Sequence, residues 1–162
     1  GLRMKTLLLP LALLLVTLAH AKAEDGPGHG SGPAHPSAFL CEKLGVPKVS
    51  ADGPEGSFNY CILDEAKMNS MSLWISLNGH MELAANTYLT HPVPPPEIRN
   101  AAAYCTFVGG EPHTFISYDR LVRADECIFN EKGHRSSIDQ LTLFRGPHYS
   151  GNQRLTQLLR GL

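Results

Sequence analysis

Residues 53–63 read GPEGSFNYCIL and contain a clear signal for a turn followed by a strand. Proline fixes one φ angle and glycine tolerates positive φ, so residues 53–56 favour a tight turn. Beyond Ser57 the run is apolar or aromatic except for Asn59, and it includes Cys61. We therefore expect a tight turn that leads into a strand over residues 58–63.

The rest of the chain alternates between short apolar runs and turn residues. Asn78-Gly79 lies between two such runs, and this dipeptide favours a hairpin because a type I′ turn needs positive φ at two residues. Gly109-Gly110 separates a second pair of runs, and Lys132-Gly133 closes another. The predicted strands cover residues 58–63, 72–77, 81–89, 104–108, 113–118, 126–130 and 141–144.

A few segments favour helix instead. Residues 64–70 contain helix formers behind a capping Asp64, and residues 97–103 allow one further turn. Residues 155–159 fit either a last strand or a short terminal helix. No repeat occurs at the 20–50-residue periods of solenoids. The pattern predicts an all-β fold, or a β-rich fold with one or two short helices: a small disulfide-bonded antiparallel sandwich or barrel.

Four cysteines support the disulfides of this prediction: Cys41, Cys61, Cys105 and Cys127. An even number in an exported chain indicates two bridges, for which three pairings exist. We favour the sequential pairing, Cys41 with Cys61 and Cys105 with Cys127, because each bridge then closes a short loop. Each bridge is expected to stabilise the fold by roughly 3 kcal/mol.

Residues 1–23 have the pattern of a cleavable signal peptide. A short basic stretch precedes thirteen uncharged residues, and alanines then alternate up to cuts after Ala21 or Ala23. Residues 1–3 precede Met4, the expected start. A membrane anchor is the competing interpretation, but thirteen residues interrupted by Pro10 are too few to span a bilayer. We expect a secreted, extracellular protein.

Residues 24–38 are dominated by glycine, proline, serine and histidine, without a large apolar residue before the end of the segment. Such a composition predicts a flexible segment. His29 and His35 offer a weak metal site at most. A single β-rich domain is expected over residues 39–162.

The charge balance bears on the partner. The whole chain has a net charge of −1, and removing residues 1–23 takes away three basic residues and no acidic one. A mildly acidic remainder argues against nucleic acid as the ligand, since phosphate affinity comes mainly from lysine and arginine. No later stretch is long and apolar enough to span a membrane. We expect a monomer that binds an extracellular protein or carbohydrate surface.

One stretch resembles a known family. Residues 136–151 begin with two serines and then place Phe144, Tyr149 and Gly151 in the order aromatic, four residues, aromatic, one residue, glycine. This pattern resembles the Greek-key signature of the βγ-crystallin family. The resemblance implies that the two aromatic rings pack around a folded hairpin and that Gly151 adopts a backbone conformation closed to other residues.

No pattern predicts a resident metal or cofactor. Calcium-binding members of that family place acidic or amide residues just before the serine pair, where this chain has Lys132 and Gly133. The cysteines lack a C-x-x-C spacing, which argues against zinc. We therefore expect neither.

His80 and Glu82 are the first candidates for chemistry. On a strand, residues two apart share a face, and with His91 or His113 nearby the pair suits metal ligation or acid–base catalysis. Solvated side chains on a hairpin explain the pair more simply. The alternative function is a small secreted hydrolase, RNase-like, with His80, Glu82, His113 and Arg120 as its catalytic group.

We favour a non-enzymatic binding or effector protein, because the chain has no G-x-S-x-G motif and its cysteines are expected to be oxidised. Loops on the β scaffold, residues 89–100 and 145–152, are the expected contact surfaces. Trp74 is expected in the core, with an exposed binding anchor as the alternative. The candidate binding residues are Pro94, Pro95, Pro96, His148 and Tyr149.

Overall fold

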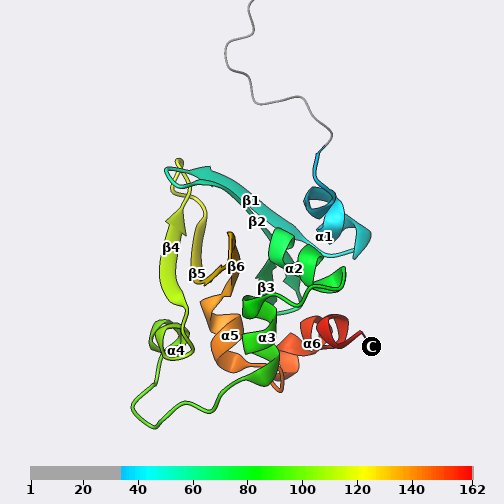
Figure 1. Ribbon diagram of the computed structural model, residues 1–162. Coiled ribbons are helices and arrows are strands. Elements are labelled where there is room, and N and C mark those ends of the chain that lie inside the picture. Colours follow the sequence, from blue (N-terminus) through cyan, green and yellow to red (C-terminus); the bar gives the residue numbers. More distant parts are fainter. Residues whose placement is uncertain (1–33, 162) are drawn as a thin grey trace, which may run out of the picture. The chain divides into compact units, whose positions relative to one another are not determined.

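The computed structural model describes residues 34–161, so the predicted signal peptide over residues 1–23 lies outside the described residues. Within this range the chain forms two 3-10 helices, six α helices and six strands (Figure 1). Their order is η1 (Pro36–Phe39), α1 (Leu40–Lys43), β1 (Lys48–Gly53), β2 (Gly56–Leu63), β3 (Ala66–Asn69), α2 (Ser70–Leu77), α3 (Leu83–Thr90), α4 (Ala101–Phe107), β4 (Glu111–Ile116), β5 (Arg123–Glu131), β6 (His134–Asp139), α5 (Gln140–Arg145), η2 (Ser150–Asn152) and α6 (Gln153–Arg160).

The six strands form one antiparallel sheet in the order β1-β2-β3-β6-β5-β4. The sheet curls, and β1 and β2 arch toward the β4–β5 end (Figure 1). The backbone N–H of Tyr118 donates to the carbonyl of Asp52 at 3.0 Å, which joins the two ends of the curl. The fold is therefore a half-barrel, and the prediction of a small disulfide-bonded β-rich fold is confirmed.

The described chain consists of two similar halves. Each half runs helix, three strands, two helices, and in each half a disulfide joins the first helix to the second strand. The bridges are Cys41–Cys61 and Cys105–Cys127, so the predicted sequential pairing is confirmed.

A pseudo-two-fold axis relates the halves at the contact of β3 with β6, where Met68 pairs with Ile138. The hydrogen bonds around this contact are reciprocal. The N–H of Lys67 donates to Thr142 Oγ1 at 2.9 Å, and the N–H of Ser137 donates to Ser72 Oγ at 3.0 Å. A strand of each half is thus hydrogen-bonded to the first turn of a helix in the other half: β3 to α5, and β6 to α2.

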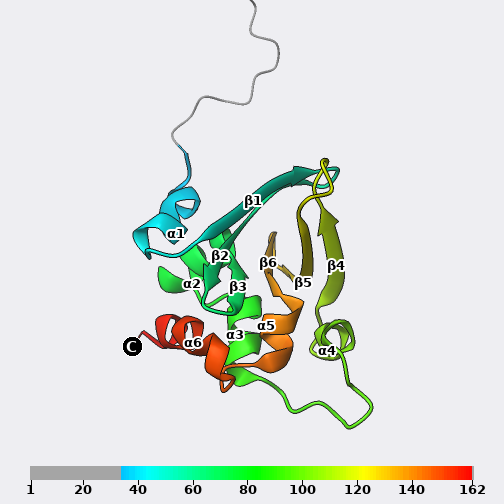
Figure 2. The same ribbon diagram turned by 180° about the vertical axis from the view of Figure 1, so that it is seen from behind.

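The two faces of the sheet are buried by different elements. Alternate strand residues point to opposite faces. Residues such as Cys61, Leu63 and Phe129 pack with the helices into the main core. Their neighbours Phe58 and Tyr60 instead join Phe115 in a small cluster. Because β2 and β4 are far apart in the sheet order, this second face must be the concave one. Figure 2 shows α2, α3 and α6 grouped beside β3.

Four predicted strands are wrong, because those segments are helical: residues 72–77 lie in α2, most of 81–89 in α3, 104–107 in α4 and 141–144 in α5. Side-chain caps start three of these helices. Asn69 accepts hydrogen bonds from two N–H groups of α2, Asn100 caps α4 and Asp139 caps α5.

The glycines that predicted hairpin turns end helices instead. Gly79 and Gly109 follow α2 and α4 with φ of +97° and +87°, and a glycine with positive φ commonly follows a helix. The helix predicted at residues 64–70 is also wrong, because Asp64 (φ +57°) sits in the β2–β3 turn and β3 follows. Residues 155–159 form part of α6, the helical one of the two alternatives.

The turns and strands with the strongest local signals are confirmed. Residues 53–56 form the tip of the β1–β2 hairpin, residues 58–63 lie in β2, and residues 126–130 lie in β5. Lys132-Gly133 forms the β5–β6 turn, and β4 covers most of the strand predicted at 113–118. Within residues 34–161, no helix has the length and apolar character needed to cross a bilayer.

Candidate ligand-binding site

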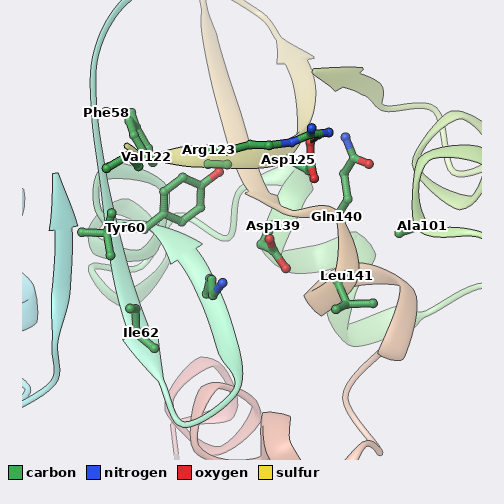
Figure 3. Close-up of a pocket in the computed structure, with 13 residues that line it drawn as sticks. Phe58, Tyr60, Ile62, Ala101, Val122, Arg123, Asp125, Asp139, Gln140 and Leu141 are labelled. Atoms are coloured by element: carbon green, nitrogen blue, oxygen red, sulfur yellow. Dashed lines mark hydrogen bonds and ion pairs between the residues drawn. The ribbon is translucent and has the colours of Figure 1, made fainter. Parts of the chain in front are cut away.

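The concave face of the half-barrel holds a cavity of about 320 Å³, called here the cup cavity (Figure 3). This volume suits a small ligand. Its apolar wall comes mainly from β1, β2 and the start of β5. The apolar lining residues are Val49, Phe58, Ile62, Ala101, Val122, Ala124 and Leu141, and the polar ones are Tyr60, Lys67, Arg123, Asp125, Asp139 and Gln140.

Tyr60 and Glu126 form a buried hydrogen bond across the curl of the sheet, from β2 to β5. Ser137 Oγ donates to the same Glu126 carboxylate at 3.2 Å, and Gln140 Nε2 donates to the Glu126 carbonyl at 2.8 Å. Burial, and then the charge of Glu126, raise the pKa of Tyr60 well above its usual value. The Tyr60 hydroxyl therefore stays a neutral donor at physiological pH and holds the two arms of the sheet together.

The polar rim of the cup cavity has available positive charge. Arg123 pairs with Asp125 at 3.3 Å, and both side chains are exposed. Lys67 forms no ion pair with any residue of the described chain. Asp139 is already engaged, since its Oδ2 accepts hydrogen bonds from the Thr142 N–H at 2.8 Å and the Thr142 hydroxyl at 2.9 Å. The rim therefore holds two cations and two carboxylates, and Lys67 is the cation among them that has no ion pair within the described chain.

A second, smaller cavity of about 210 Å³ lies on the same face and is more polar. Glu126 and Ser137 line it, together with His113, which forms an ion pair with Glu55, and Arg135. Tyr60 lines only the cup cavity and Glu126 only the second one, so their hydrogen bond marks the boundary between an apolar and a polar half of the concave face.

The four residues of the predicted hydrolase do not form one group. His113 lies on β4 beside Glu55, and Arg120 lies in the β4–β5 loop with φ of +59°. His80 and Glu82 lie in the α2–α3 connection, beside His134. The predicted neighbours of that pair, His91 and His113, lie elsewhere: the His91 ring contacts the Phe144 carbonyl at 3.1 Å.

The predicted binding residues lie on two other loops. Pro94, Pro95 and Pro96 belong to the connection between α3 and α4, which is tied to the body by the Tyr104 hydroxyl donating to the Pro92 carbonyl at 2.8 Å. His148 is exposed in the α5–η2 connection, and Tyr149 donates to Glu65 at 2.8 Å. None of them lines the cup cavity.

Two other predicted positions have clear places. Trp74 is half-buried, packs against the main core and meets the His35 ring edge-on at 4.8 Å, in agreement with its predicted core role. The predicted hairpin around Phe144 and Tyr149 is not formed, because Phe144 lies in α5 and Gly151 lies in η2 without a positive φ. The family resemblance itself stays a prediction.

Sequence reasoning missed the cup cavity. A signal was present in β2, where Phe58, Tyr60 and Ile62 alternate with Cys61 and Leu63. A strand that is apolar on both faces is expected to be covered on both. The long-range partners Glu126 and Lys67 had no comparable signal.

No family model, curated protein or solved structure matches this chain. The class of the protein therefore follows from its own geometry. It is a disulfide-bonded half-barrel of two similar halves with an open cavity on its concave face.

Proposed function

We propose that this chain is a secreted binding protein without catalytic activity, and that its cup cavity takes a small amphipathic ligand with an anionic end. The observation that carries the proposal is the lining: an apolar wall beside a rim on which Arg123 is paired with Asp125 and Lys67 has no ion pair within the described chain. The leader pattern of residues 1–23 and two fully buried disulfides support an extracellular location.

Apolar burial supplies the affinity in this proposal, and charge supplies the orientation. Burying an alkyl chain against Val49, Phe58 and Ile62 gains roughly 25 cal/mol per Å² of apolar surface. The anionic end would then lie at the rim, where Lys67 has no other ionic partner among residues 34–161. A hydrolase is less well supported, since its four candidate residues are dispersed.

The test is calorimetric titration of the intact disulfide-bonded protein with decanoate. Decanol and decyltrimethylammonium serve as the uncharged and the cationic comparison. We expect saturable binding in the order decanoate, decanol, decyltrimethylammonium. Lys67→Ala and Arg123→Ala should each weaken decanoate binding and leave decanol binding unchanged.

Ile62→Asp should weaken decanoate and decanol alike, because it places a charge in the apolar wall. The matched control is Arg154→Ala, a surface arginine that donates to the Leu44 carbonyl outside the cavity. The proposal fails if no member of the series binds, or if Ile62→Asp and Arg154→Ala bind all three probes equally well.

A second candidate function has its own observation. At the tip of the β4–β5 hairpin Tyr118 is 73 % exposed and Leu121 is 84 % exposed. The tip is rigid, since Asp119 accepts from the Leu121 N–H at 3.0 Å and Ser117 Oγ accepts from the Val122 N–H at 3.0 Å. Hydrogen bonds from Ser117 and from the Leu121 amide lower the pKa of Asp119.

Exposed aromatic and aliphatic side chains on a preorganised turn are typical anchors for a protein partner. We therefore infer recognition of an extracellular protein through this tip as the second function. The test is cross-linking of the secreted protein to its source cells. Tyr118→Ser with Leu121→Ser should abolish a specific adduct while decanoate binding stays intact.

A further inference from the structure

Four metal-ligating side chains meet where the α2–α3 connection packs against the β5–β6 turn, and none of them lines the cup cavity. They are His80 and Glu82 from the connection, and Glu131 and His134 from the turn. One ligand atom each of His80, Glu131 and His134 lies within 4.8 Å of the others. His134 Nε2 is 3.5 Å from Glu131 Oε2 and 2.9 Å from Glu82 Oε1.

The carboxylates in this cluster lack the partners that buried charges require. The Glu82 side chain is 0 % exposed, and neither of its oxygens accepts a hydrogen bond of good geometry. The side chains of Ser72 and His134 lie near enough to lower its pKa, but burial outweighs them and raises it. Glu131 is 12 % exposed, and its Oε2 also accepts none. Orphaned buried polar atoms are rare in folded proteins and need an explanation.

No fixed positive charge balances these two carboxylates. Within residues 34–161, the ion-pair partners of Glu82 and Glu131 are limited to His134. If both carboxyl groups are ionised and both imidazoles are neutral, the cluster has two negative charges and two nitrogen lone pairs. A divalent cation would cancel the charge and occupy the orphaned oxygens in a single step.

The pseudo-two-fold axis supplies a comparison. At the equivalent corner the β2–β3 turn of the first half packs against η2 and the α5–η2 connection of the second half, and Glu65 is the acidic residue there. Arg145 donates to Glu65 at 2.8 Å, and so does the Tyr149 hydroxyl. Asn152 precedes α6 as Glu82 precedes α3, and its amide donates to two carbonyls of the α5 end. Arg145 therefore supplies a cation at the Glu65 corner, whereas no lysine or arginine of the described chain forms an ion pair with Glu82 or Glu131.

We propose that His80, Glu131 and His134 bind one zinc ion, with Glu82 as the fourth, buried ligand. Zinc takes four nitrogen, oxygen or sulfur ligands at bonds of about 2.0–2.2 Å, so its ligand atoms lie about 3.4 Å apart. The ligand atoms of His80, Glu131 and His134 already lie within 4.8 Å of one another, and Glu82 Oε1 lies 2.9 Å from His134 Nε2, so the side chains must close in on the ion to reach this geometry. Imidazoles favour zinc over calcium or magnesium, which prefer oxygen alone.

The bound ion has a structural role. It cross-links a connection between two helices to a turn between two strands, and so joins the two halves at a corner that lacks a disulfide. This role is independent of the proposed ligand in the cup cavity. Loss of zinc binding therefore leaves the decanoate test intact, and failure of the decanoate test leaves this inference intact.

The experiment is calorimetric titration of the intact, chelator-treated chain with zinc chloride, without a histidine tag. We expect one zinc per chain and a raised melting temperature, because binding to the native state stabilises it. His80→Ala, His134→Ala and Glu131→Gln should each weaken binding by more than about tenfold. Millimolar calcium should leave the isotherm unchanged.

His148→Ala is the matched control, since His148 is exposed and lies outside the cluster. Far-ultraviolet circular dichroism confirms that each variant is folded, and Glu131→Gln provides a second reading if an alanine variant is not. The inference is overturned if the wild type binds no zinc. It is equally overturned if the three cluster variants bind as tightly as His148→Ala.

Discussion

The two halves of the molecule share a frame and differ in what they present to solvent. Each half has its helix-to-strand disulfide and its reciprocal hydrogen bond at the Met68–Ile138 contact. On the concave face, β2 of the first half presents Phe58 and Tyr60 where β5 of the second presents Ala124 and Glu126. The two halves thus share a frame but differ in the side chains that line the concave face.

The two equivalent corners show the same divergence. Glu65 is neutralised by Arg145 in one, whereas Glu82 and Glu131 face only histidines in the other. The ion pair neutralises Glu65 without any added ion. In the zinc proposal, the cluster of histidines and carboxylates at the other corner is neutralised by a bound cation.

Removal of a disulfide should have the largest effect on the shared frame. Cys41→Ala with Cys61→Ala, and Cys105→Ala with Cys127→Ala, open loops with sequence separations of 20 and 22. Each pair should lower the free energy of unfolding by roughly 3 kcal/mol, because loops of similar length lose similar entropy. Urea denaturation measures both, and a several-fold difference would show that the halves are not energetically equivalent.

Gly53 tests the closure of the half-barrel. A Cβ at this position would lie 2.6 Å from the Ile116 carbonyl oxygen and 2.7 Å from the Phe115 ring. Gly53→Ala should therefore destabilise the fold by about 2 kcal/mol through overpacking. Pro54→Ala, at the exposed tip of the same hairpin, should cost below about 1 kcal/mol. Equal losses in the two variants would mean that the arms of the sheet do not meet at Gly53.

Alkaline pH should destabilise the fold through its buried tyrosines. Burial raises the pKa of Tyr104 to about 12, and the pKa values of Tyr60 and Tyr88 are also raised by burial first. Since the unfolded chain releases these protons near pH 10, stability is full below pH 10 and falls as pH rises toward 12. Tyr104 alone accounts for roughly 1 kcal/mol at pH 11. Urea midpoints at pH 8, 10 and 11 measure the loss, and a flat profile contradicts it.

The reciprocal hydroxyls should have smaller and similar effects. Ser72→Ala and Thr142→Val each remove the acceptor of one bond across the pseudo-two-fold axis, at about 1 kcal/mol. Thr142→Val should cost slightly more, because Thr142 also donates to Asp139. Thr142→Ser keeps the hydroxyl and should lose only the roughly 0.8 kcal/mol of the buried methyl group. Thermal unfolding distinguishes these cases, and a neutral Ser72→Ala would remove the basis for reciprocity.

The smallest effect is expected at the Glu65 corner. Glu65→Gln breaks a largely exposed ion pair and should change stability by less than about 1 kcal/mol. It should also lower the pKa of Tyr149, which the hydrogen bond to Glu65 raises. Ultraviolet titration of the tyrosines reads the second effect. An unchanged titration would mean that Tyr149 does not contact Glu65 in solution.

Local signals in the sequence predicted part of this architecture. The turn at residues 53–56, the strand at 58–63 and the sequential disulfides follow from turn chemistry and loop length. The hairpin predicted at Asn78-Gly79 failed because a glycine with positive φ ends a helix as readily as it turns a strand. Asn69, three residues before Ser72, was the overlooked sign of a helix start.

The two-fold repeat was also present in the sequence. Cys41 and Cys105 are each followed four residues later by a glycine. Asn69 and Asp139 are each followed three residues later by a serine or threonine and four residues later by a leucine. The spacing between corresponding residues of the two halves is longer than the 20–50-residue period of solenoid repeats. The sites themselves lay beyond local signals, because Tyr60 meets Glu126 and His80 meets His134 only after the sheet curls and the halves pack.

The most direct test of the cup cavity as the ligand site is an NMR titration of the isotope-labelled protein with decanoate. We predict that the largest amide shift changes fall on residues of β2 and on Val122 to Ala124, which line the cavity. Changes confined to residues 89–100 and 145–152 would contradict this account and place recognition in those two loops instead.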